Sequence, residues 1–497
     1  MAYLRNKLTE WIPALLAAVA FSVVLTPAGD ALPVQTWTFE GICRELVAGT
    51  TEGRQALVGS LWHAPLPTLV GLPGAALLPR GASIPLVARG TTFLALFFLA
   101  YTLLRFCRRQ FSMWPAMLFW LACLLLLARL PGLTTQPQMA VTLAVAAATV
   151  LKFADWFDGR RLGDLVKFSF ALALLALCGA HLAGWTLLLA LLLPLVALLD
   201  PALRPRLQGL LILGLLPVLY AMSIWLLMSR LMLADAIYPW RALIHTPPAW
   251  TGWPAAGMAP HHLGAVACCA LLGGLAACRR DRRTALLGVS GVALLVWHTV
   301  LQGYGLAWAT GPAAGLLTLM ALLTLASALG VLAARPHTVP LRHRLAVAGV
   351  GLVFLALCIP PRGSSPTLAM QDRQTQRRLL DAVEHYVESR TPYGRVFICS
   401  YRGLGLLEGD ARERFVACLD LHVDALRERY HRQNLFLLVP RPEADAAFEC
   451  AVWRYHDIYG HGAARALFAG DWGDWRLYEI ITAPTADELL EWRQRER

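Results

Sequence analysis

Two acidic residues near the start of the chain are candidates for a general base. Glu40 lies in the segment Trp37-Thr-Phe-Glu40-Gly41, and Asp30 precedes it, closer to the end of an apolar run. A carboxylate beside a membrane can take a proton from an incoming hydroxyl or amine, or help hold a divalent metal ion on a phosphate. A solvated loop acid is the alternative interpretation, because exposed acids are common.

Two further positions are candidates for binding a phosphate. Trp62 and His63 open a corner that continues with Ala64-Pro65-Leu66, and His63 could donate to a phosphate or orient the acid. The alternative is an ordinary belt of Trp and His at the membrane interface. Arg89 opens the next apolar run, where it could bind an anionic lipid phosphate or extend to the headgroups.

Three polar residues lie in later connections. Gln138 stands at the start of another apolar run, where capping or turn formation is the usual role. The loop 230–262 is rich in Trp, Pro and His, and its Arg241 and His245 could grip a lipid-linked phosphate.

The composition indicates an integral membrane protein. Of 497 residues, 57% are hydrophobic and 15% charged, and the mean hydropathy is +0.53. Soluble domains carry about 25% charged residues. The net charge of +12 comes from short basic clusters between apolar runs, a pattern typical of cytoplasmic anchors. The clusters therefore argue against nucleic acid as a partner.

The apolar runs predict about 11 spanning helices, each of roughly 20 residues. The stretch 64–79 is short and interrupted by four prolines, so we expect it to lie at the interface or to re-enter. The expected spans are 10–27, 86–105, 112–130, 137–153, 166–182, 183–199, 207–229, 262–278, 284–301, 311–334 and 345–360.

The distribution of basic residues predicts the orientation of these spans. With the N-terminus in the cytoplasm, five clusters containing Lys or Arg fall in cytoplasmic loops, whereas the opposite loops 131–136 and 302–310 contain none. The first outer loop (residues 28–85), the loop 230–261 and everything after about residue 361 then face the periplasm.

The chain divides into a transmembrane domain at 1–361 and a periplasmic domain at 362–497. In the second, alternating patterns predict helices at 370–389, 410–430 and 443–457, strands at 396–400 and 435–439, and a hairpin from 464–469 and 475–482. Such alternation favours a small α/β fold. Cys399, Cys418 and Cys450 could include one disulfide, or all three could be reduced and buried.

The first 200 residues resemble the C-type glycosyltransferase superfamily, nearest to its bacterial protein-mannosyltransferase and aminoarabinose-transferase branch. The resemblance places Glu40 on the family's early outer acid and Arg89 on the Arg that opens the following helix. Trp62, His63, Pro65 and Leu66 fall on its His-Pro-Pro-Leu corner, with Ala64 replacing the first Pro. Gln138 falls near a second outer acid that many members carry, so here that acid is absent.

The resemblance implies an inner-membrane enzyme that uses a polyprenyl-phosphate-linked sugar as donor and acts at the periplasmic face. A divalent cation such as Mg²⁺ or Mn²⁺ is a possible cofactor. The acceptor (lipid, protein or glycan) and the sugar stay open. The alternatives are a non-catalytic homologue, an envelope assembly protein whose C-terminal domain is the working part, and a lipid or solute transporter. The few intramembrane charges argue against the transporter.

Overall fold

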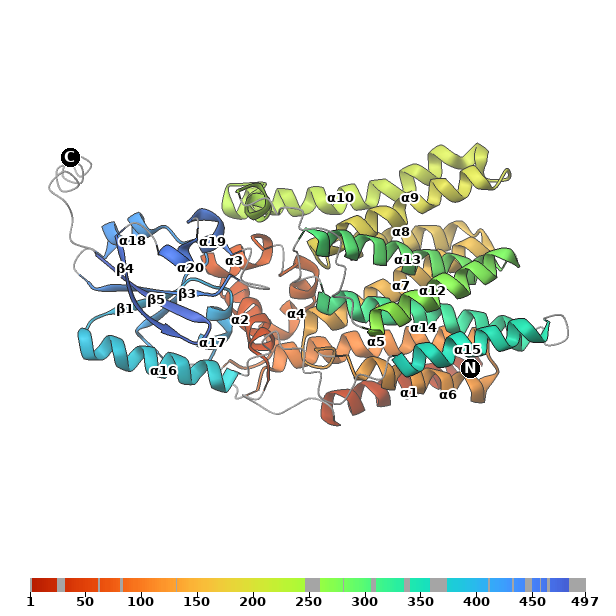
Figure 1. The fold of residues 1–497 in the computed structure, drawn as a ribbon, viewed down its shortest axis with the longest axis horizontal. Coiled ribbons are helices and arrows are strands. Elements are labelled where there is room, and N and C mark those ends of the chain that lie inside the picture. Colours follow the sequence, from red (N-terminus) through yellow and green to blue (C-terminus); the bar gives the residue numbers. More distant parts are fainter. Residues whose placement is uncertain are drawn as a thin grey trace.

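The protein is mostly helical, with a helix bundle at one end and a small α/β unit at the other (Figure 1). The structure is a computed structural model. It describes residues 2–24, 32–60, 63–80, 84–130, 132–245, 260–279, 281–304, 310–334, 340–357, 373–409, 412–430, 433–442, 449–455, 457–462 and 465–481.

Each expected span overlaps a helix of the bundle. Five helices among the described residues are long and apolar enough to cross a membrane, namely α5, α7, α10, α13 and α14. The count of about 11 spans stays a prediction. The bundle helices are α1 (Ala2–Val24), α5 (Leu86–Gln110), α6 (Met113–Ala128), α7 (Pro137–Gly159), α8 (Leu162–Ala176), α9 (Ala183–Leu199), α10 (Leu207–Leu233), α12 (Pro260–Cys278), α13 (Arg282–Gly303), α14 (Thr310–Ala334) and α15 (Leu341–Leu357).

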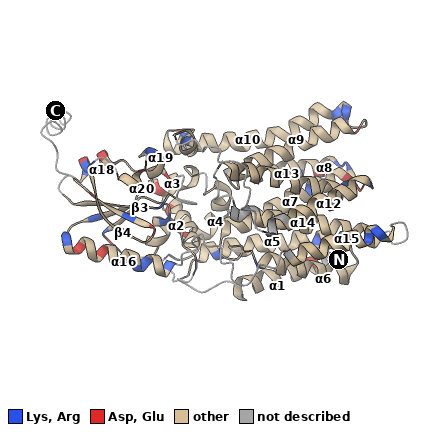
Figure 2. Ribbon diagram, viewed as in Figure 1, with Lys and Arg blue, Asp and Glu red and all other residues tan. Residues whose placement is uncertain are grey.

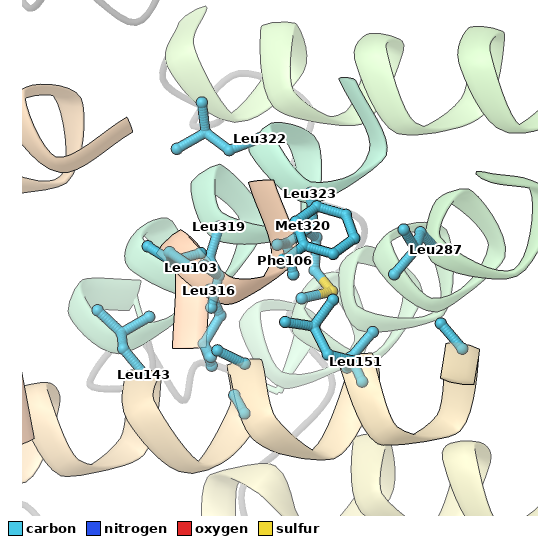
Figure 3. Close-up of a cluster of buried hydrophobic side chains, with 14 of the residues drawn as sticks. Leu103, Phe106, Leu143, Leu151, Leu287, Leu316, Leu319, Met320, Leu322 and Leu323 are labelled. Carbon is cyan, nitrogen blue, oxygen red and sulfur yellow. The ribbon is translucent and has the colours of Figure 1, made fainter. Parts of the chain in front are cut away.

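The core of the bundle lies where α14 packs against α5, α7 and α13. Leu316 and Met320 of α14 are fully buried there, beside Leu103 of α5, Leu143 of α7 and Leu287 of α13 (Figure 3). Side chains from four helices thus fill one apolar layer, which fixes how the ends of these helices are placed.

Basic residues gather at the end of the bundle remote from the α/β unit (Figure 2). Asp155 near the end of α7 bonds Arg109 of α5, Arg283 of α13 and Lys152 of its own helix, at 2.8–2.9 Å. A second pair, Arg160–Asp200, links the ends of α7 and α9 at 3.0 Å. These basic clusters therefore share one end of the bundle, as the sequence predicts.

The first outer loop, the connection between the first two expected spans, is largely helical. It forms α2 (Val34–Ala48), α3 (Thr51–Val58) and α4 (Pro65–Leu77), which lie between the bundle and the α/β unit (Figure 1). The expected apolar stretch 64–79 corresponds to α4, whose 13 residues are too few to span a bilayer. Pro65 occupies the first turn of α4, where proline is tolerated.

The α/β unit contains a five-stranded sheet in the order β2-β1-β3-β5-β4. Strands β1, β2 and β3 are parallel, and β5 runs antiparallel to β3 and β4. The strands are β1 (Arg395–Ile398), β2 (Phe415–Ala417), β3 (Leu435–Pro440), β4 (Ala466–Trp472) and β5 (Trp475–Ile480). Its helices are α16 (Arg373–Arg390), α17 (Arg402–Leu407), α18 (Val423–Arg429), α19 (Cys450–Arg454) and α20 (Ile458–His461).

Three sequence expectations for this unit are settled. The single helix expected at 410–430 was wrong, because β2 pairs with β1 within it and only the short α18 follows. The helix expected at 443–457 is represented by α19, and residues 443–448 lie outside the described residues. Cys399, Cys418 and Cys450 are free thiols, as in the reduced alternative, but only Cys399 and Cys450 are buried, and Cys418 is partly buried.

Candidate functional site

Helix α2 carries Glu40 and is enclosed on nearly all sides. Its residues from Val34 to Arg44 are buried apart from the half-buried Gln35. Glu40 and Arg44 are only 3% and 2% exposed. A charged side chain withdrawn from water must be paired, and the spacing of four residues places these two on one helix face. Arg44 accordingly donates to Glu40 Oε1 from Nη2 at 3.0 Å and from Nε at 3.1 Å.

The second oxygen of Glu40 caps another helix. Glu40 Oε2 accepts a hydrogen bond from the backbone N–H of Ala88, at 2.9 Å, in the first turn of α5. The first N–H groups of a helix have no partner within it and carry partial positive charge, so a carboxylate there is stabilising. Arg89 is the next residue of that turn, and Glu40 therefore holds the backbone that presents Arg89.

Arg44 binds the other end of the α4–α5 connection, where α4 ends. Its guanidinium donates to the carbonyls of Ala75 and Leu78, at 2.9 and 2.6 Å, and to that of Pro79 at 2.9 Å. The last carbonyls of α4 lack intrahelical partners, and a cation satisfies them. The pair Glu40–Arg44 thus joins the end of α4 to the start of α5.

The burial of Glu40 also changes its acidity. Desolvation raises the pKa of its carboxyl, while the Ala88 N–H and the Arg44 guanidinium act in the opposite direction. Burial likewise raises the pKa of Glu408 at the end of α17, and the nearby Glu40 charge adds to that effect. A carboxyl with a raised pKa is a better proton acceptor near neutral pH.

His63 lies in a second group of contacts and is 2% exposed. Its Nδ1 lies 2.7 Å from Nε2 of Gln138, at the start of α7. Its ring faces the ring of Tyr401 from the α/β unit, with centroids 5.1 Å apart and planes tilted by 36°. His63 therefore joins the bundle to the α/β unit. Two residues singled out in the sequence, His63 and Gln138, are therefore in contact.

Helices α2 and α17 approach each other closely through glycines. A Cβ on Gly41 would lie 2.5 Å from the carbonyl oxygen of Leu404, and one on Gly405 would overlap the backbone of Thr38. Only glycine permits this backbone contact. The start of α16 adds a cation–π contact, because Arg373 lies 3.6 Å above the ring of Trp37.

A second polar contact between bundle and α/β unit centres on Tyr238. Its hydroxyl accepts from Gln55 Nε2 of α3 at 2.6 Å and donates to Asp420 Oδ1 at 3.3 Å. Asp420 follows β2 and also binds Arg454. Burial raises the pKa of Tyr238, which keeps the phenol protonated and able to donate.

The other sequence-predicted site residues are not brought to these contacts. Arg241 pairs with Asp235 in its own connection and is 40% exposed. His245 ends the short helix α11 (Arg241–His245), and its side chain lies outside the described residues. Asp30 and Trp62 also lie outside them.

The donor set does not fit a divalent metal ion. Gln138 supplies an amide where the resemblance expects an acid, and its nitrogen engages His63. Both oxygens of Glu40 are engaged by protein groups. Over the described part of the chain, no three His, Cys, Asp or Glu side chains are grouped as metal ligands. Mg²⁺ and Mn²⁺ prefer several oxygen donors, which these residues do not offer together.

A small cavity lies elsewhere, between α13, α14 and the short 3-10 segment Ala180–Leu182 that precedes α9. It is lined by His181, Trp297 and His298 together with Leu182, Leu294, Leu301 and Leu316. None of its lining residues belongs to the Glu40 or His63 contacts.

Two important residues escaped the sequence analysis. Arg44 had a signal, because it stands four residues after Glu40, the spacing of a helical ion pair. Tyr401 had a weaker one: it follows a parallel strand, and ligand-contacting residues collect at the carboxyl ends of such strands where the strand order reverses. Asp420 follows β2 at the same edge of the sheet.

The overall fold is similar to that of ArnT, as the sequence resemblance implies. The chain aligns with the crystal structure of ArnT from Cupriavidus metallidurans in the apo state, with a TM-score of 0.51 and 16% identity, over 96% of this chain and 100% of that one. The structure of the same protein bound to undecaprenyl phosphate aligns with a TM-score of 0.47 and 15% identity, over 96% and 99%. No family model matches the sequence. No curated protein matches it significantly.

Proposed function

We propose that this protein is an integral-membrane glycosyltransferase that moves a sugar from a polyprenyl-phosphate donor to an acceptor at the periplasmic face. The observation that carries the proposal is a fold shared over 96% of the chain with ArnT, an aminoarabinose transferase. Because one fold can host many functions, the site must supply further support. That support comes from Glu40, whose carboxylate binds the backbone of the turn that carries Arg89, and from His63, which contacts Tyr401 of the α/β unit.

In the proposed reaction the acceptor hydroxyl or amine gives its proton to the Glu40 carboxylate. The acceptor atom attacks the anomeric carbon, the bond from that carbon to the phosphate oxygen breaks, and polyprenyl phosphate leaves with the bonding electrons. The raised pKa of Glu40 favours proton acceptance. For this step the carboxylate must exchange one of its present partners, Ala88 N–H or Arg44, for the acceptor.

The leaving phosphate requires positive charge and hydrogen-bond donors. Arg89 and His63 are the proposed ligands, with Trp62 against the lipid and Gln138 orienting His63. Arg241 and His245 are proposed to meet the phosphate from the loop after α10. For Arg241 this requires release from Asp235.

The proposed orientation places the N-terminus and the basic end of the bundle in the cytoplasm. The α/β unit is at the opposite end (Figure 2), so it would lie in the periplasm. The chain would then be a multi-pass protein of the inner membrane.

A non-catalytic homologue or envelope assembly protein is the second candidate. It is favoured by the engagement of both Glu40 oxygens in structural contacts and by Gln138 in place of an acid. An assembly function would use the α/β unit for binding and would need no base at residue 40.

Mass spectrometry of membrane lipids and envelope glycans, with and without the gene, tests the proposal. We expect one glycan modification to disappear with the gene and to return with the wild-type copy. The charge-neutral double variant Glu40→Gln/Arg44→Gln removes the carboxylate without leaving a buried charge, and should lower the modification by about a hundredfold or more. Glu45→Gln on the same helix is the matched control and should restore the modification fully.

A folded double variant that restores the modification normally would remove Glu40 from the base role, and Asp30→Asn would be examined next. Unchanged lipids and glycans in the deletion strain would favour the assembly protein.

A further inference from the structure

The connection between β1 and α17 carries the α/β unit into the candidate site. Ser400 and Tyr401 follow the carboxyl end of β1, and both are buried. Tyr401 is 5% exposed and lies against His63. Burial of the Tyr401 ring against His63 indicates a specific contact between the α/β unit and the first outer loop.

Contacts on several sides define the position of the His63 imidazole. Gln138 meets Nδ1 at 2.7 Å, and the Tyr401 ring covers one face. The backbone N–H of His63 donates to Ser60 Oγ at 3.1 Å, and the side chain of Ser60 also hydrogen-bonds the Tyr401 hydroxyl. Because the Gln138 amide nitrogen can only donate, Nδ1 accepts, and a neutral imidazole carries its hydrogen on Nε2.

Tyr401 is itself held from within the α/β unit. Its backbone N–H donates to Oε1 of Glu449 at 3.0 Å, and Ser400 Oγ donates to the same oxygen at 2.7 Å. Burial raises the pKa of the Tyr401 hydroxyl, with the nearby Glu449 charge contributing, so the phenol stays protonated. The close contact of Gly405 with α2 fixes how near the β1–α17 connection lies to α2.

We infer that Tyr401 is a positioning residue for His63, supplied by the C-terminal unit. The inference rests on the proposed function, in which Nε2–H of His63 donates to the leaving phosphate. Tyr401 keeps the imidazole plane fixed between its own ring and the Gln138 amide. The α/β unit therefore completes the phosphate side of the site.

Two variants of the full-length protein in detergent distinguish the contribution of the Tyr401 ring from that of its hydroxyl. Tyr401→Ala removes the ring, and carbethoxylation of His63 by diethyl pyrocarbonate, followed by mass spectrometry, should rise to the level of the exposed His422. Tyr401→Phe keeps the ring and should leave His63 protected. Tyr393→Ala, at an 82% exposed position of the same unit, is the matched control and should also leave it protected.

Two functional assays are used: binding of undecaprenyl phosphate to the purified protein, and glycan modification in cells. Tyr401→Ala should lower the modification by about a hundredfold, the effect of displacing a group by about 1 Å, and should weaken binding of undecaprenyl phosphate. Tyr401→Phe should restore both. Tyr238→Phe weakens the other contact between bundle and α/β unit and should change neither, which distinguishes positioning of His63 from general docking.

The inference is overturned if Tyr401→Ala leaves His63 protected, or if Tyr238→Phe lowers the modification and lipid binding as much as Tyr401→Ala does. The proposed function fails separately, if the wild-type protein supports no modification and binds no undecaprenyl phosphate. In that case the His63 protection experiment still decides whether Tyr401 fixes the imidazole.

Discussion

The two ends of the bundle use the same pair of chemical groups, arginine and carboxylate, in opposite surroundings. Near the α/β unit, Glu40 and Arg44 are 3% and 2% exposed and hydrogen-bond to each other and to backbone groups of α4 and α5. At the remote end, Asp155 is 11% exposed, and its partners Arg109, Lys152 and Arg283 are 41%, 25% and 16% exposed. Water and salt can reach the second cluster but hardly the first.

The difference in exposure suits the two groups of charges to different structural roles. Breaking a buried pair leaves an uncompensated charge in a poor solvent, whereas an exposed pair contributes little because water replaces either partner. The buried pair can therefore fix backbone geometry at the α4–α5 connection. The remote cluster mainly collects positive charge at one face, which is what orientation in a membrane requires.

The largest effect is expected from breaking the buried pair. Arg44→Ala should lower the free energy of unfolding by about 3–5 kcal/mol, because Glu40 stays buried without its partner and the carbonyls of α4 lose their donor. Unfolding by sodium dodecyl sulfate in mixed micelles measures this. The double variant Glu40→Gln/Arg44→Gln should recover much of the loss, and an equal loss in both would show that charge balance is unimportant.

A smaller effect is expected where α17 touches α2. Gly405→Ala should destabilise by about 1–3 kcal/mol, because the added Cβ overlaps the backbone of Thr38 and forces the helices apart. Gly90→Ala in α5 is the matched control, since its Cβ meets nothing within 4 Å. That control should be neutral or slightly stabilising. Equal melting temperatures for the two variants would contradict the close packing.

The contact at Tyr238 should contribute less. Tyr238→Phe removes the hydroxyl that joins Gln55 to Asp420, and should cost about 1 kcal/mol in the free energy of unfolding. A double-mutant cycle of Tyr238→Phe with Asp420→Asn measures the coupling energy between these two residues. Strictly additive losses would mean that the 3.3 Å contact between them contributes nothing.

The smallest effect is expected at the remote cluster. Asp155→Asn should cost about 1 kcal/mol or less, and the difference from wild type should shrink as the salt concentration rises. Unfolding at low and high sodium chloride measures both quantities. A loss as large as that of Arg44→Ala would erase the distinction between the two ends.

The sequence predicted the bundle well, because runs of about 20 apolar residues report burial in lipid directly. The strand β3 was predicted for a similar reason, because it is a continuous apolar run whose residues are all buried. The hairpin β4–β5 was predicted from two short strand-like segments close together in the sequence. The short strand β2 was missed, since three residues give too little pattern and their pairing with β1 is set by distant segments. The helical nature of the first outer loop was missed because α2 is buried on nearly all sides and has no polar face.

The candidate site was predicted only in part. Glu40, His63 and Gln138 were identified by residue type and position, but their partners lie far away in sequence. Tyr401 meets His63 across more than half of the chain, and no local pattern encodes such a contact. The pairing of Glu40 with Arg44 was within reach, because the four-residue spacing is local.

One measurement tests the central claim most directly: the envelope glycan modification in cells that carry the Glu40→Gln/Arg44→Gln variant, with Glu45→Gln on the same helix as the control. We expect a folded double variant in which the modification is lost, and a Glu45→Gln variant that retains it. Normal modification by the folded double variant would contradict the assignment of Glu40 as the base.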